Sequence, residues 1–143
     1  MKKYILFISL MPLLQASQCN KKNPDCDGHS HSALIIKNNS GLKINYAFYW
    51  NYPDTIITKE QSPLYYSQKA VASGDSVIRG AGMGTCWEVV FMDKPREWIY
   101  FFNEDSLEQI PWHIIKTTGR GILERRELNL SYLQQRNFVV TYP

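Results

Sequence analysis

The stretch 42–50, LKINYAFYW, has the clearest secondary-structure pattern in the chain. Its large apolar residues occupy every second position, namely Leu42, Ile44, Tyr46, Phe48 and Trp50. Side chains alternate between the two faces of a β-strand, so this period of two predicts a strand with that face turned toward a core. Residues 38–41, Asn-Asn-Ser-Gly, favour a tight turn because Asn and Gly accept positive φ. Together with the β-rich run 33–37, this pattern predicts a hairpin over residues 33–50.

Further short β-rich runs follow, separated by turn residues. They cover residues 55–58, 65–71, 76–79, 86–92, 98–103 and 138–142, with an extended or mixed segment at 122–130. Residues 93–97 predict a second hairpin loop. Helical signals are confined to a segment from Asp105 or Ser106 to Ile110, and another from Ser131 to Arg136. About seven short strands with one or two short helices predict an all-β fold, an antiparallel β-sandwich, with a small β-barrel as the alternative.

The N-terminus has a different pattern. Lys2 and Lys3 precede an apolar run of about eleven residues from Tyr4 to Leu14. This run is too short to cross a hydrocarbon core of about 30 Å as a helix, but it is typical of a cleaved leader. We therefore expect residues 1–18 to be a signal peptide.

Residues 16–19, Ala-Ser-Gln-Cys, resemble the lipobox of bacterial lipoproteins, whose cysteine receives a diacylglycerol and becomes the new N-terminus. Gln18 departs from the usual Gly, Ala or Ser before the cysteine. The pattern predicts lipidation at Cys19, a polar tether over residues 19–32 and a single β-rich domain over residues 33–143. An ordinary secretory leader cut near Gln18 is the alternative.

The chain contains three cysteines. If Cys19 carries lipid, Cys26 and Cys86 remain as a candidate disulfide in an oxidising compartment. The alternative is that Cys26 keeps a free thiol within the tether.

The charge pattern excludes nucleic acid as a partner. With the two leader lysines removed, the formal net charge falls from +3 to +1, which leaves no basic stripe to neutralise phosphates. The C-terminal arginines mix with acidic residues, as on a solvated surface; these residues are Arg120, Glu124, Arg125, Arg126, Glu127 and Arg136.

Four segments resemble those of a family of small lipoproteins of uncharacterised activity from Bacteroidetes-type bacteria. They are the run 46–54 ending in Asn-Tyr-Pro-Asp, the pair Pro111-Trp112, the segment 128–133 and the C-terminal run 139–143. The resemblance implies an envelope lipoprotein with a compact β-rich domain. It brings no catalytic or ligand-binding residues with it.

Aromatic side chains are the most suggestive binding candidates, because Tyr and Trp suit sugar stacking and protein interfaces. Tyr49, Tyr52 and Tyr65 are the candidate exposed contacts, and a place in the core is the alternative for each. We expect a non-enzymatic binding or structural module, lipid-anchored in the cell envelope at the outer membrane. Its partners are the membrane and either a glycan or an envelope protein, and a glycan-binding accessory protein is the alternative function.

Two weaker patterns involve cysteine and histidine. Cys86 and His113 could serve as nucleophile and base of a thiol enzyme or hydrolase, but Cys86 begins a predicted β-run rather than a helix. Cys26, His29 and His31 are residue types that bind zinc, yet they fall in the predicted tether. The sequence therefore predicts no metal, no cofactor and no catalytic residue.

Overall fold

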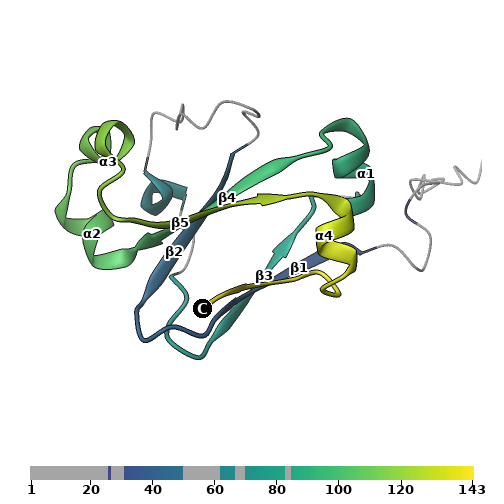
Figure 1. Cartoon of the computed structure of the whole chain (residues 1–143), viewed down its shortest axis with the longest axis horizontal. Coiled ribbons are helices and arrows are strands. Elements are labelled where there is room, and N and C mark those ends of the chain that lie inside the picture. The colour runs from purple at the N-terminus through teal and green to yellow at the C-terminus, as the bar shows by residue number, and fades with distance from the viewer. Residues whose placement is uncertain (1–25, 27–30, 50–61, 67–69, 83–84) are drawn as a thin grey trace, which may run out of the picture.

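Two three-stranded β-sheets share one apolar core in the computed structural model, which describes residues 26, 31–49, 62–66, 70–82 and 85–143 (Figure 1). The first sheet has the order β3-β1-β6 and contains β1 (Ala33–Asn38), β3 (Ser76–Gly80) and β6 (Val139–Tyr142). The second has the order β2-β4-β5 and contains β2 (Ile44–Tyr49), β4 (Glu97–Asn103) and β5 (Ile122–Leu128). All pairings are antiparallel except that of β1 with β6. The described residues are thus mostly β, and their sheets do not close into a barrel.

Short helices lie at both ends of the sheets. Figure 1 shows α2 (Glu104–Gln109) and α3 (Trp112–Thr118) at one end, and α1 (Trp87–Asp93) and α4 (Leu130–Gln134) at the other. A 3-10 helix, η1, spans Pro63–Tyr66. Asparagine caps two of the helices, because the side-chain oxygen of Asn103 accepts from Ser106 N at 2.8 Å and that of Asn129 accepts from Tyr132 N at 2.8 Å. Within the described residues, no helix is long and apolar enough to cross a membrane.

β2 and most of β4 are buried on both faces of the second sheet, whereas β5 is largely half-buried. Tyr46 and Phe48 point into a core shared with the first sheet, α1 and α4. Ala47 and Tyr49, on the opposite face of β2, pack in a second core with Leu107 and Ile115 of α2 and α3. The strand predicted at 42–50 is confirmed for Ile44–Tyr49, but the expectation of one buried face is wrong because helices cover the other.

The predicted hairpin over residues 33–50 is wrong. The two edges of β1 are occupied by β3 and β6, so β2 joins the other sheet. The turn itself is present and is held by Asn38, a fully buried residue. Its side-chain nitrogen donates to the carbonyls of Leu42 at 2.7 Å and Val71 at 2.9 Å, and its side-chain oxygen accepts from Ser40 N at 3.0 Å. Asn38 therefore connects the two sheets where the chain passes between them.

The predicted strand over 86–92 is also wrong, because α1 forms there. Trp87 and Phe91 are its buried residues, and a spacing of four places them on one helical face. The hairpin loop predicted at 93–97 accordingly connects a helix to β4. Of the run predicted as a strand at 65–71, residues 65 and 66 belong to η1 instead, Val71 makes an isolated bridge with Ile44, and residues 67–69 lie outside the described residues.

The remaining expectations agree better with the structure. The runs 76–79, 98–103 and 138–142 correspond to β3, β4 and β6, and the mixed segment 122–130 contains β5. The two helical signals correspond to α2 and α4, whereas α3 was not predicted. The strand expected at 55–58 lies outside the described residues.

Candidate functional site

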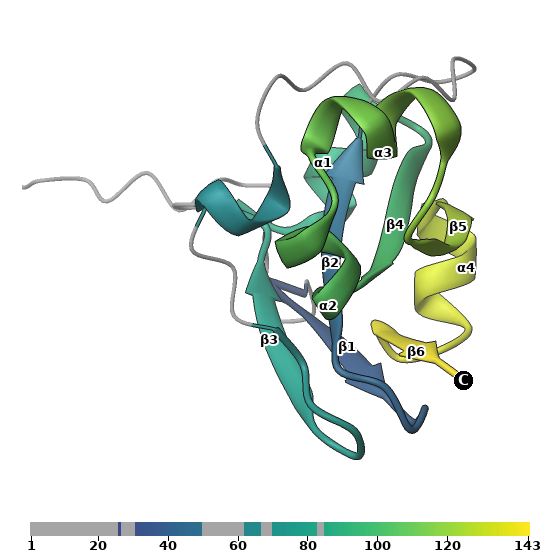
Figure 2. The same ribbon diagram turned by 90° about the vertical axis from the view of Figure 1, so that its left-hand side faces the viewer.

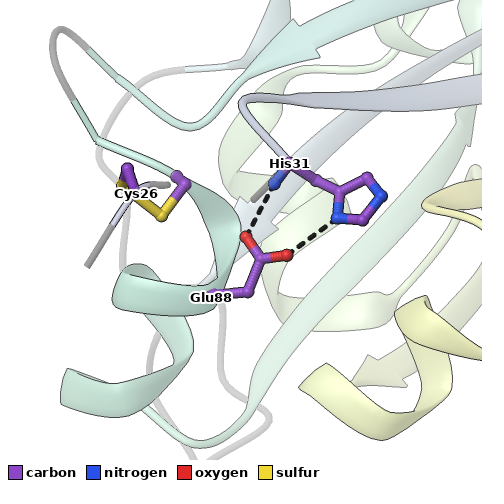
Figure 3. Close-up of a disulfide and its surroundings, with 4 residues drawn as sticks. Cys26, His31 and Glu88 are labelled. Atoms are coloured by element: carbon purple, nitrogen blue, oxygen red, sulfur yellow. Dashed lines mark hydrogen bonds and ion pairs between the residues drawn. A yellow bond between two sulfur atoms is a disulfide. The ribbon is translucent and has the colours of Figure 1, made fainter. Parts of the chain in front are cut away.

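A disulfide joins Cys26 to Cys86, which directly precedes α1 (Figure 3). Their Cα atoms are 5.8 Å apart and their positions in the sequence differ by 60. Cys86 is also almost completely buried, with 1 % of its surface exposed. Neither sulfur is a thiolate in this state, so Cys86 is not available as a nucleophile and Cys26 is not available as a metal ligand.

His31 attaches the next part of the chain to the same end of α1. Its backbone N donates to one carboxylate oxygen of Glu88 at 2.9 Å, and its Nδ1 lies 2.8 Å from the other (Figure 3). Its carbonyl accepts from Trp87 N at 2.8 Å, and its ring stacks on Phe138 with centroids 3.8 Å apart. These contacts and the disulfide together form what we call the anchor junction.

The pKa of Glu88 reflects this arrangement. Burial alone would raise the pKa of its carboxyl, but the hydrogen bonds from His31 outweigh burial and hold it below the ordinary value of 4.5. The carboxylate is therefore ionised at neutral pH and accepts both bonds from His31.

The structure does not support Tyr49 as an exposed contact. Only 4 % of its surface is exposed, and its ring packs edge-on against Tyr100 with centroids 4.9 Å apart. The α2 and α3 helices that cover this face of β2 are the reason. Tyr52 and the side chain of Tyr65 lie outside the described residues, so both stay predictions.

Cys86 and His113, the candidate nucleophile and base of a thiol enzyme, do not lie close together. His113 belongs to α3 and Cys86 precedes α1, and these helices lie at opposite ends of the molecule (Figure 1). Of the weak metal candidates, His31 faces Glu88 and His29 lies outside the described residues. No group of three metal-ligating side chains occurs in the part of the chain that the structure describes. Cys19, the predicted lipidation site, is also outside that part.

A cavity of about 560 Å³ is lined by residues of β5, α4 and β6 and of the turn between α4 and β6. Figure 2 shows these three elements on the same side of the molecule. We call this space the arginine cavity, and its lining residues are Arg126, Tyr132, Arg136, Asn137, Val139 and Thr141. The sequence pattern suggested only a solvated mixed-charge surface here. That expectation is wrong for Arg126, whose side chain is 22 % exposed and spans the gap between the edge strands of the two sheets.

Arg126 is fixed by partners from three elements. Its Nε donates to Glu124 at 2.7 Å, and one terminal nitrogen donates to the Tyr132 hydroxyl at 3.1 Å and to the carbonyl of Thr141 at 2.9 Å. Burial alone would lower the pKa of Arg126, but the bonds to Glu124 and Tyr132 raise it above its ordinary value. The guanidinium therefore remains charged while it connects β5, α4 and β6.

Arg136 forms the other side of the cavity. Its guanidinium carbon lies 4.1 Å from the centre of the Tyr132 ring, which is the geometry of a cation–π contact. The next two residues, Asn137 and Phe138, have φ of 49° and 57°. The left-handed region is unusual for a bulky residue such as Phe138, which is held there by its burial and by a 2.8 Å bond from its N to the carbonyl of Leu133.

Comparison with protein families, with curated proteins and with solved structures finds no match to this chain.

Proposed function

We propose that this chain is an exported protein, anchored by lipid on Cys19 at the outer membrane, whose β-rich domain is a non-catalytic binding or structural module. The observation that carries the proposal is the Cys26–Cys86 disulfide. Disulfides persist in oxidising compartments such as the bacterial envelope, to which the leader directs the chain. With two of the three cysteines paired, Cys19 is the one left for the acyl groups.

The tether length supports the same proposal. Cys26 comes seven positions after Cys19, and an extended chain of that length reaches about 25 Å. Without the disulfide, the first described residue held to α1 would be His31, twelve positions after Cys19, and an extended chain of that length reaches about 40 Å. The anchor junction thus keeps the domain close to a lipidated Cys19. Two acyl chains are sufficient for stable anchoring, whereas one is marginal.

A β-sandwich is the scaffold we propose for this module. Residues from both sheets fill one core, with Leu34 and Ile36 on one side and Ile99 and Phe101 on the other. A seventh strand at 55–58 remains a prediction. The resemblance to small Bacteroidetes-type lipoproteins, noted from the sequence, agrees with an envelope role.

Metabolic labelling with radioactive palmitate tests the lipid anchor. The wild-type chain should incorporate label, Cys19→Ala should not, and globomycin should cause the unprocessed precursor to accumulate. The matched control is the double variant Cys26→Ser/Cys86→Ala, which removes the other two cysteines and should still be labelled. An unlabelled wild-type chain, or a labelled Cys19→Ala chain, would reject the anchor.

A glycan-binding accessory role is the second candidate. The tyrosines first considered for it give little support, because Tyr49 is buried. The arginine cavity offers a better basis, since it combines fixed charge with hydroxyl and amide groups.

A further inference from the structure

We propose that the arginine cavity binds a ligand bearing both a carboxylate and several hydroxyls, for which a uronic acid is the simplest chemical class. This inference rests on the binding role proposed above and gives it a location and a ligand chemistry.

The cavity carries a net positive charge. The charge of Arg126 is balanced by Glu124, which accepts from its Nε at 2.7 Å. Arg136, in contrast, forms no ion pair with any of the described residues, and its contact there is the neutral ring of Tyr132. A guanidinium presents paired N–H donors that match the two oxygens of a carboxylate. Arg136 is therefore the group that would receive an anionic ligand.

The walls favour hydroxyl groups beside the anion. Asn137 supplies both a donor and an acceptor, and the hydroxyl of Thr141 supplies the same pair. Val139 is the one aliphatic residue of the lining. A volume of about 560 Å³ is in the range of small-molecule sites, which is far more than a bare inorganic anion needs.

The Arg126 side chain and the backbone of the turn are held in place without a ligand. Three hydrogen bonds hold Arg126 to β5, α4 and β6. The turn that presents Arg136 and Asn137 is fixed by bonds from Phe138 N to Leu133 O and from Val139 N to Arg136 O, at 2.8 Å and 3.0 Å. Positions fixed in advance lose less conformational entropy on binding. The left-handed conformation of Asn137 and Phe138 is a further sign of a constrained site.

Isothermal calorimetry on the full chain, purified in detergent as the cell makes it, tests the proposal with sodium glucuronate as the probe. Glucose, acetate and inorganic phosphate are the comparison ligands. Glucuronate should bind at least about tenfold more tightly than each of them, because only glucuronate offers both the carboxylate and the hydroxyls. Its affinity should fall as the salt concentration rises.

Two variants assign the binding to this cavity. Arg136→Gln should weaken glucuronate binding at least about tenfold, while Arg120→Gln, the same change at an exposed turn beyond α3, should leave it unchanged. Thr141→Val removes a hydroxyl but keeps the carbonyl that Arg126 binds, so it should weaken glucuronate without unfolding the domain. Circular dichroism checks that each variant is folded.

Three results would overturn the proposal: no heat with glucuronate, equal binding of phosphate, or unchanged binding by folded Arg136→Gln. The titration does not depend on where the chain is anchored. Failure of palmitate labelling with intact glucuronate binding would reject the lipid anchor alone, and the reverse result would reject the ligand alone.

Discussion

Removing the Cys26–Cys86 cross-link should destabilise the domain substantially. The bond connects positions 60 apart in the sequence, so it restricts a long loop in the unfolded chain. On the chain-entropy model, a loop of this length corresponds to about 4 kcal/mol of stability. At about 4 °C per kcal/mol for a chain of this size, the melting temperature should fall by about 15 °C.

Thermal unfolding with and without reductant measures this effect while both side chains remain in place. The double variant Cys26→Ser/Cys86→Ala should show a similar loss, with the alanine chosen because position 86 is buried. Cys19→Ala is the matched control, since it removes a cysteine outside the cross-link and should leave the transition unchanged. Equal melting temperatures for the oxidised and reduced wild-type protein would show that the cross-link does not stabilise the domain.

Two further predictions concern the anchor junction and a crowded glycine. Because the pKa of Glu88 is lowered in the folded state, its contribution to the free energy of unfolding is fully present above pH 4.5 and is lost as the pH falls through the folded pKa. In urea unfolding, Glu88→Gln should therefore be less stable than wild type by about 1–2 kcal/mol at pH 7, and its stability should fall less steeply toward acid pH. Parallel curves of stability against pH for the two proteins would contradict this. Gly121→Ala should lower the free energy of unfolding by about 1–3 kcal/mol more than Gly74→Ala does. Both glycines have positive φ, but a Cβ at position 121 would lie 2.7 Å from the Cβ of Ser106, whereas a Cβ at position 74 would have no atom within 4 Å. Equal urea midpoints would show that Ser106 moves aside freely.

The sequence predicted strands well where the pattern was local. β2 and β4 have runs of aromatic and β-branched residues bounded by turn residues, which sterics alone favour as strands. The starts of α2 and α4 were predicted within two residues, at Asp105 or Ser106 and at Ser131, but the side chains that cap these helices are those of Asn103 and Asn129. These features depend on neighbours within a few residues.

The pairing of the strands and the burial of individual side chains could not be predicted from such local patterns. Nothing in residues 33–50 indicates that β6, about a hundred residues later, occupies the edge of β1 that a hairpin would have used. The run 86–92 is rich in residues that favour strands, and it is a helix because Trp87 and Phe91 both fill the shared core. Tyr49 was expected at the surface because α3, which helps to bury it, had no clear signal.

The candidate sites also differ in whether the sequence alone predicts them. Cys26 and Cys86 were recognisable as a candidate pair from the count of cysteines. The arginine cavity was not, because its members come from β5, α4, a left-handed turn and β6. In the sequence, Arg126 and Arg136 resemble any other exposed arginines, and a structure was needed to show that one is fixed between two sheets.

Intact mass spectrometry of the protein purified from membranes reports signal-peptide cleavage, lipidation and the disulfide in a single measurement. We expect a chain that has lost residues 1–18 and carries a diacylglycerol and any further acyl group on Cys19. It should be two hydrogens lighter than its reduced form, because Cys26 and Cys86 are bonded. A chain with an unmodified Cys19, whether uncut or cut elsewhere, would contradict this expectation.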